Sequence, residues 1–117
     1  MDEPTIRGRA QAMADALVDG DIERAMVDLS TQLRRNLGEV LALLPLPATE
    51  ATIESVQPTG TGWTAVMRIV GETDEVAVST RWKDRAGEPT VIEVSHLSRE
   101  ARSAEAASAD LEVTQES

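Results

Sequence analysis

Hydrophobic residues recur every three to four positions through the first 44 residues, and this spacing predicts amphipathic helices. The first stripe covers residues 6–18 and ends at Gly20, because glycine readily adopts the left-handed conformation of a helix cap. A second stripe covers 22–29 and a third covers 33–44. Pro45 ends the third helix, because proline disfavours helix at the residue before it.

After Pro47 the hydrophobic period changes to two, which is typical of strands with one buried face. Four such runs cover residues 50–57, 62–70, 75–83 and 89–97, separated by short segments rich in turn residues. Short connections between successive strands favour antiparallel hairpins. We therefore predict an α+β fold, in which three N-terminal helices pack on one face of a four-stranded antiparallel meander sheet.

The turns also predict how the strands are aligned. If each hairpin closes symmetrically, Gln57 lies opposite Trp63, Trp63 opposite Trp82, and Trp82 opposite Thr90. This alignment gathers a mostly apolar set on one face, which we assign to the helices: Ala51, Ile53, Ser55, Ala65, Met67, Ile69, Val76, Val78, Thr80, Ile92, Val94 and His96. A slip of one residue would turn every one of these side chains over.

The opposite, outer face of the predicted sheet is mixed. Polar and charged residues alternate there with five apolar ones, namely Val56, Val66, Val70, Val91 and Leu97. A half-apolar outer face is more than a monomer needs, and it indicates an interface between subunits. We expect these five residues to form the contact of a homodimer.

Composition narrows the classes of function. The chain has two Trp and neither Phe nor Tyr, so its core must be built largely from aliphatic side chains. Its net charge of −10 repels phosphate backbones and anionic lipid surfaces, so neither nucleic acid nor a membrane is an expected partner. The absence of Cys excludes disulfides and thiolate ligands and fits a reducing compartment. With no apolar leader segment visible, a cytoplasmic location is expected.

The composition shifts near residue 99 towards Ala, Ser and Glu. Residues 99–117 carry five acidic and two basic residues and have no sustained apolar period. We therefore predict a single domain over residues 1–98 and a disordered or weakly helical acidic tail over 99–117.

Two segments resemble parts of a known superfamily. One is the connection between the first two predicted helices, ALVDGDIERA (16–25), and the other is the strand pair TRWKDRAGEPTVI (80–92). Both are similar to the corresponding segments of NTF2-like (cystatin-like, SnoaL-like) domains. The resemblance covers roughly residues 5–98. It implies a curved sheet wrapped around helices, a pocket at the open end, and dimerisation through the outer sheet face. Members include isomerases, cyclases, dehydratases and non-catalytic binding modules.

This chain departs from that pattern in two respects. The extra strand that members often have between the helices is not apparent. The Tyr hydroxyl that stabilises the oxyanion in ketosteroid isomerase-like members has no counterpart either, because the chain has no Tyr.

Five residues are candidates for lining a ligand pocket on the inner face: Trp63, Met67, Trp82, Val94 and His96. As the only histidine, His96 is the one candidate for a general base or acid, although a strand-end histidine is often only hydrogen-bonded or partly solvated. Trp63 and Trp82 either line a pocket mouth or fill the core as its only large side chains. Asp28 lies off the apolar stripes, so we expect it to be exposed.

Nothing in the sequence predicts a metal or a cofactor. One histidine and scattered carboxylates lack the spacing of metal ligands. The segment Gly60-Thr61-Gly62 precedes a strand and not a helix, unlike a phosphate-binding loop.

Three functions follow as hypotheses. The first is a non-catalytic module that dimerises and binds at most a small apolar ligand. The second is a SnoaL-like isomerase, cyclase or hydratase that acts on a small apolar substrate with His96 as general base. The third is an accessory subunit whose third helix or tail binds another protein.

Overall fold

The computed structural model describes residues 2–101, which form helices first and one sheet after them. The helices are α1 (Glu3–Asp19), α2 (Ile22–Ala25), α3 (Thr31–Arg35) and α4 (Leu37–Ala42). The strands are β1 (Ala48–Thr59), β2 (Gly62–Gly71), β3 (Asp74–Arg85) and β4 (Glu88–Ala101). They pair antiparallel in the order β1-β2-β3-β4. The predicted α+β fold, with helices followed by a four-stranded antiparallel sheet, is confirmed.

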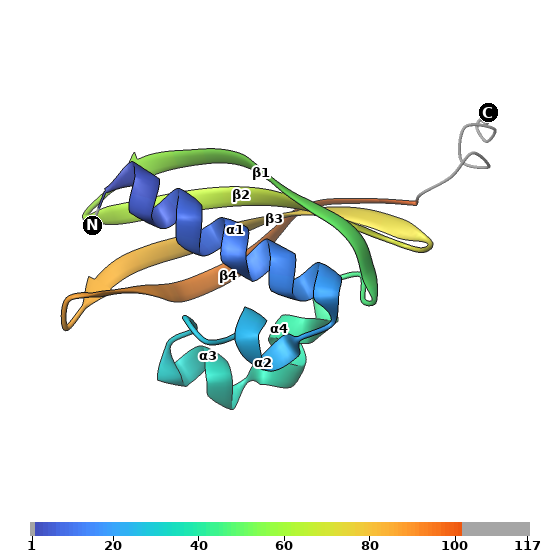
Figure 1. Cartoon of the computed structure of the whole chain (residues 1–117), viewed down its shortest axis with the longest axis horizontal. Helices are drawn as coiled ribbons and strands as arrows, with labels where there is room; N and C mark the ends of the chain where they lie inside the picture. Colours follow the sequence, from blue (N-terminus) through green and yellow to red (C-terminus); the bar gives the residue numbers. More distant parts are fainter. Residues whose placement is uncertain (1, 102–117) are drawn as a thin grey trace.

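Helix α1 lies across the inner face of the curved sheet, and α2, α3 and α4 gather beside β4 (Figure 1). The carboxylate of Asp2 accepts a hydrogen bond from the backbone N–H of Thr5 (3.1 Å) and so caps the start of α1. Gly20 ends this helix in the left-handed conformation, with a φ of 78°. The predicted first helix is thus present with the predicted ending.

The two predicted helices that follow are shorter and differently divided. Helix α2 ends at Ala25, and the residues after it lead to a backbone pairing with β4. The predicted third helix is two helices, because Asn36 leaves helical geometry (φ −110°, ψ 33°) and its N–H bonds back to the carbonyl of Leu33 (3.1 Å). Ser30 caps the first of them by accepting from the Leu33 N–H (3.2 Å).

Of the three predicted strand alignments, the pairing of Trp63 with Trp82 is confirmed. The other two are wrong by one residue: Pro58 lies opposite Trp63, and Val91 lies opposite Trp82. The reason is that both outer hairpins close with two-residue turns, Gly60-Thr61 and Ala86-Gly87.

Bulges then shift the alignment further along the strands. In β1 the pairing shifts between Ala48 and Glu50 and between Ile53 and Ser55, and in β4 it shifts once at Ile92 and once at Leu97. Each bulge reverses which residues face the helices, because side chains alternate with a period of two.

The one-residue offset at the two turns corrects two expected interface residues, because both lie between a turn and the first bulge of their strand. Val56 and Val91 do not lie on the outer face but in the core, where they are 7% and 0% exposed. Ser55, which was expected to face the helices, instead pairs with the outward-facing Val66.

The core lies between α1 and the inner sheet face, and Trp82 is its largest fully buried side chain. The indole Nε1–H of Trp82 donates to the hydroxyl of Thr80 (2.9 Å), which in turn donates to the backbone carbonyl of Ala65 (2.9 Å). Thr80 is itself buried, so this chain of bonds satisfies polar groups that water does not reach.

Strand β4 continues past the predicted domain end. It pairs with β3 through Ala101, so residues 99–101 of the expected tail are strand. The rest of the expected tail, residues 102–117, lies outside the described part of the chain. Within residues 2–101, no helix is long and apolar enough to cross a membrane.

Candidate functional site

The space between the helices and the sheet holds a very small apolar pocket. Its volume is only about 10 Å³, and it is lined by Met13, Leu17, Met26, Leu29, Val40, Leu44, Met67, Ile69, Val78, Thr80 and Val94. A single water needs roughly 10–15 Å³, and small-molecule sites typically measure about 300–1,000 Å³. Side chains of the helices and the sheet therefore fill the space where a pocket was expected.

The structure divides the five predicted pocket residues. Met67 and Val94 line this small pocket, whereas Trp63, Trp82 and His96 do not. Trp82 is buried, and the half-buried Trp63 packs against the same core. The interpretation of both Trp residues as core-filling side chains agrees with this geometry.

His96 lies on the helix side of the sheet, as the alignment predicts, but it is exposed. Its Nε2–H donates to the backbone carbonyl oxygen of Leu43 (2.6 Å), just after α4. Within the described chain this contact ties β4 to the end of the helices, and no carboxylate joins it. The geometry is that of a structural hydrogen bond and not of an acid–base pair in a cavity.

The outer sheet face presents a central row of small side chains that crosses all four strands. Ser55 pairs with Val66, Val66 with Ser79, and Ser79 with Ser95, and all four are half-buried. The helices lie on the other side of the sheet (Figure 1). Of the remaining expected interface residues, Val70 is 9% exposed, and Leu97 is 58% exposed beside a bulge in β4.

Two arginines on this face, Arg68 and Arg81, are paired with carboxylates of the same face. Arg68 donates to Glu54 through Nε (2.9 Å) and also pairs with Glu75. The hydrogen bonds to these two carboxylates raise the pKa of Arg68. On the other side of the central row, Arg81 lies 3.9 Å from Glu93. Each arginine therefore already has its counter-ion.

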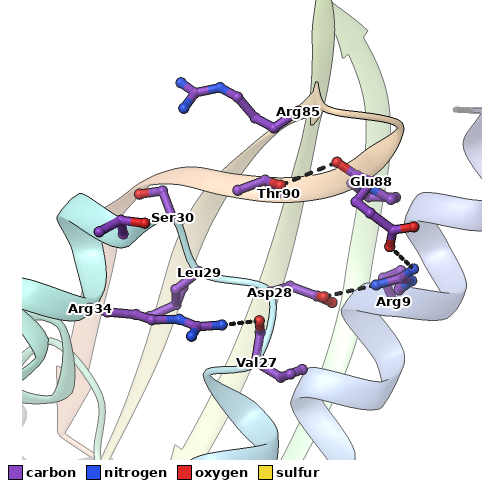
Figure 2. A pocket seen from close by; sticks show the side chains of 11 residues that line it. Arg9, Val27, Asp28, Leu29, Ser30, Arg34, Arg85, Glu88 and Thr90 are labelled. Carbon is purple, nitrogen blue, oxygen red and sulfur yellow. Dashed lines mark hydrogen bonds and ion pairs between the residues drawn. The ribbon is translucent and has the colours of Figure 1, made fainter.

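A second feature is an open polar hollow of about 550 Å³ between α1, the 27–31 segment and the β3–β4 hairpin (Figure 2). The segment is held to β4 by two backbone hydrogen bonds: Ser30 N–H donates to the Val91 carbonyl, and Val91 N–H donates to the Asp28 carbonyl, both at 2.8 Å. These bonds fix one wall of the hollow against the edge of the sheet.

Arg9 of α1 joins two walls of the hollow. It donates to Asp28 (2.8 Å) and to Glu88 (3.1 Å), as Figure 2 shows. The hydrogen bond to Glu88 and the charge of Asp28 raise the pKa of Arg9. The prediction that Asp28 is exposed is wrong, because its side chain is only 13% exposed in this ion pair.

Sequence reasoning did not find this cluster. Arg9 and Glu88 are 79 positions apart, and neither stands in a recognisable motif. The one available signal was Arg9, a basic residue on the polar side of the first predicted helix. Such residues are common on the solvent-exposed face of a helix.

Among residues 2–101, no group of three or more His, Cys, Asp or Glu side chains is arranged to hold a metal ion. Comparison of the chain with models of known protein families, with curated proteins and with solved structures found no match.

Proposed function

We propose that this chain is a non-catalytic, NTF2-like module that forms a homodimer through its outer sheet face. The observation that carries the proposal is the contrast between a filled interior and an open outer face whose centre holds small side chains. A face of this kind allows a second sheet to approach to the spacing of about 10 Å that is typical of stacked sheets.

The outer face is self-complementary in size along its two central strands. The outward-facing pairs between β2 and β3 each join a larger side chain to a smaller one: Thr64 with Arg81, Val66 with Ser79, and Arg68 with Ala77. In the proposed dimer, the two-fold axis lies between the two sheets, parallel to the strands and midway between β2 and β3. It places each residue of a pair opposite the other member of the same pair in the second copy. Each arginine then lies over a small neutral side chain of the second copy, and no two arginines face each other.

The pairing of the charges lowers the electrostatic cost of association. Because Arg68 and Arg81 already have carboxylate partners on their own sheet, covering them does not leave an isolated charge without a counter-ion. Val66, at the centre of the face, supplies the apolar contact. The dimer proposed here therefore uses Val66 and its row, with Val70 and Leu97 further out, and does not use Val56 or Val91.

The observations give less support to the other two hypotheses. An isomerase, cyclase or hydratase that uses His96 requires that residue to line a substrate cavity, and it contacts the Leu43 carbonyl instead. A small apolar ligand requires more room than the apolar pocket of about 10 Å³ provides. For an accessory subunit, no described feature identifies the protein that it would bind.

The proposal is tested by the mass of the full chain in solution. We expect light scattering at high micromolar concentration to give twice the chain mass of 12.6 kDa. Val66→Arg places an unpaired charge at the centre of the face and should give the mass of one chain. The matched control is Val27→Arg, on the helix side at a residue that is 59% exposed, and it should remain dimeric.

Two results would contradict the proposal. One is a wild-type chain that stays monomeric at this concentration. The other is a Val66→Arg variant that keeps its circular dichroism spectrum and remains dimeric, which would place the interface elsewhere.

A further inference from the structure

We propose that the polar hollow between α1, the 27–31 segment and the β3–β4 hairpin binds an oxyanion, a phosphate or carboxylate group, carried by a small molecule. The hollow lies on the helix side of the molecule, away from the outer sheet face. The inference is therefore independent of the proposed dimer.

Charge is the first observation. Three arginines line the hollow, Arg9, Arg34 and Arg85, against two carboxylates, Asp28 and Glu88. The lining therefore has a formal excess of one positive charge in a chain whose net charge is −10. A local positive site on an acidic protein is where an anion is repelled least, and concave walls strengthen the local field.

The second observation concerns the two carboxylates. Arg9 forms ion pairs with both of them, at 2.8 Å and 3.1 Å. Arg9 is therefore the counter-ion of both carboxylates. The remaining two arginines are then not balanced by any acidic residue of the lining. Figure 2 shows Arg85 pointing away from Glu88, above the β3–β4 hairpin in this view, and Arg34 below the hairpin with its guanidinium beside the Val27 carbonyl.

The third observation is a surplus of hydrogen-bond donors. Within residues 2–101, the guanidinium of Arg85 has no protein acceptor, and Arg34 uses one Nη on the carbonyl of Val27. The Ser30 hydroxyl oxygen accepts from the Leu33 N–H (3.2 Å), which leaves its O–H available as a donor, and the Thr31 hydroxyl lines the same hollow. Guanidinium and hydroxyl donors together match the acceptor oxygens of a phosphate or carboxylate.

Size indicates that the anion belongs to a larger molecule. The hollow of about 550 Å³ falls within the range of about 300–1,000 Å³ that is usual for small-molecule sites. A bare oxyanion would fill only a small part of it. The remaining lining, which includes Val27, Leu29 and Pro89, offers apolar contacts to the rest of such a ligand.

The test uses inorganic phosphate as the first probe. We would titrate it into the ¹⁵N-labelled full-length chain at constant ionic strength and follow the backbone amide shifts. We expect saturable shifts at Ser30, Thr31 and Arg85, with millimolar affinity. Arg85→Gln should weaken binding by about tenfold or more, as expected for the loss of a charge-assisted donor. Arg34→Gln should weaken it in the same direction.

Arg7→Gln is the matched control, because Arg7 is an exposed arginine of α1 outside the hollow, paired with Glu3. It should bind phosphate as the wild type does. Phenyl phosphate, benzoate and phenol then separate the sources of the anion. Tighter binding of phenyl phosphate than of benzoate assigns a phosphate ligand, and the reverse assigns a carboxylate. Phenol, which carries no charge at neutral pH, should not bind.

Three results would overturn the inference: shifts that grow linearly without saturation, equal binding by the wild type and a folded Arg85→Gln variant, or an equal loss in Arg7→Gln. The Val66→Arg variant should bind phosphate with unchanged affinity. A failure of the dimer would therefore be distinguishable from a failure of this site.

Discussion

The two faces of the sheet are made by the same strands and have opposite properties. On the inner face, Ala65, Met67 and Ile69 of β2 are at most 1% exposed beneath the helices. On the outer face, Val66 and Arg68 of the same strand are half-buried, with no described helix over them. Alternation along one strand thus gives one face to the core and leaves the other available for assembly.

This difference indicates where function can be placed. The resemblance to NTF2-like domains implies a ligand pocket between sheet and helices, but in this chain methionine and leucine side chains occupy that space. Two of them are Met13 of α1 and Met26, the residue directly after α2, and flexible thioether side chains fill irregular gaps well. The surfaces, and not the interior, are therefore where we propose both self-association and ligand binding.

The largest expected effect is the loss of stability when a side chain of the inner face is removed. Trp82→Ala removes the largest fully buried side chain and should lower the free energy of unfolding by about 3–5 kcal/mol. Urea unfolding followed by circular dichroism, at a fixed protein concentration, measures it. Trp63→Ala is the matched comparison and should cost clearly less, because Trp63 is only half-buried. Equal losses for the two variants would contradict the described difference in burial.

A smaller effect is expected from a change of polarity at constant shape. Thr80→Val keeps the side-chain volume but leaves the Trp82 N–H and the Ala65 carbonyl without their partner, at a cost of about 1–3 kcal/mol. Thr52→Val, at an exposed position of β1, makes the same chemical change and should stay within about 0.5 kcal/mol of wild type. Similar values for both in urea titrations would mean that the buried hydrogen bonds add little.

The smallest expected effect is on the N-terminal cap of α1, which Asp2 provides. The hydrogen bonds from Thr5 lower the pKa of Asp2 below its ordinary value of 3.8. Because the folded-state pKa is the lower one, the charged cap stabilises the fold above pH 3.8, and this contribution is lost as pH falls through the folded-state value. Thermal unfolding of the wild type and Asp2→Ala should therefore differ slightly near neutral pH and converge in acid. A difference that persists unchanged in strong acid would exclude this cap.

The sequence was sufficient to predict the order of elements and the pairing of Trp63 with Trp82, because these follow from local periods and turn residues. It was not sufficient to place the bulges near Glu54, Ile92 and Leu97. A bulge depends on how two strands fit together and has no dedicated residue type here. The two-residue turns were not predicted either, and for that reason Val56 and Val91, which lie between a turn and the first bulge, were predicted on the wrong face.

The polar hollow was beyond sequence reasoning for a related reason. Its walls come from α1, from the 27–31 segment and from the β3–β4 hairpin, and only the folded chain brings Arg9, Asp28 and Glu88 together. The break at Asn36 was missed because Leu33 and Leu37 continue the helical period through it. Periodicity identifies which side chains are buried but not whether the backbone between them stays helical.

The central claim, that two copies meet outer face to outer face, is tested most directly by the distance between identical positions. The chain contains no Cys, so Thr52→Cys gives a single spin-label site at an exposed, outward-facing position away from the central row, and Glu39→Cys gives one on the helix side. Pulsed electron–electron double resonance should find a short distance between the two labels at position 52 and a much longer one at position 39. A short distance at 39 and a long one at 52, or no dipolar coupling at either, would contradict the proposed dimer.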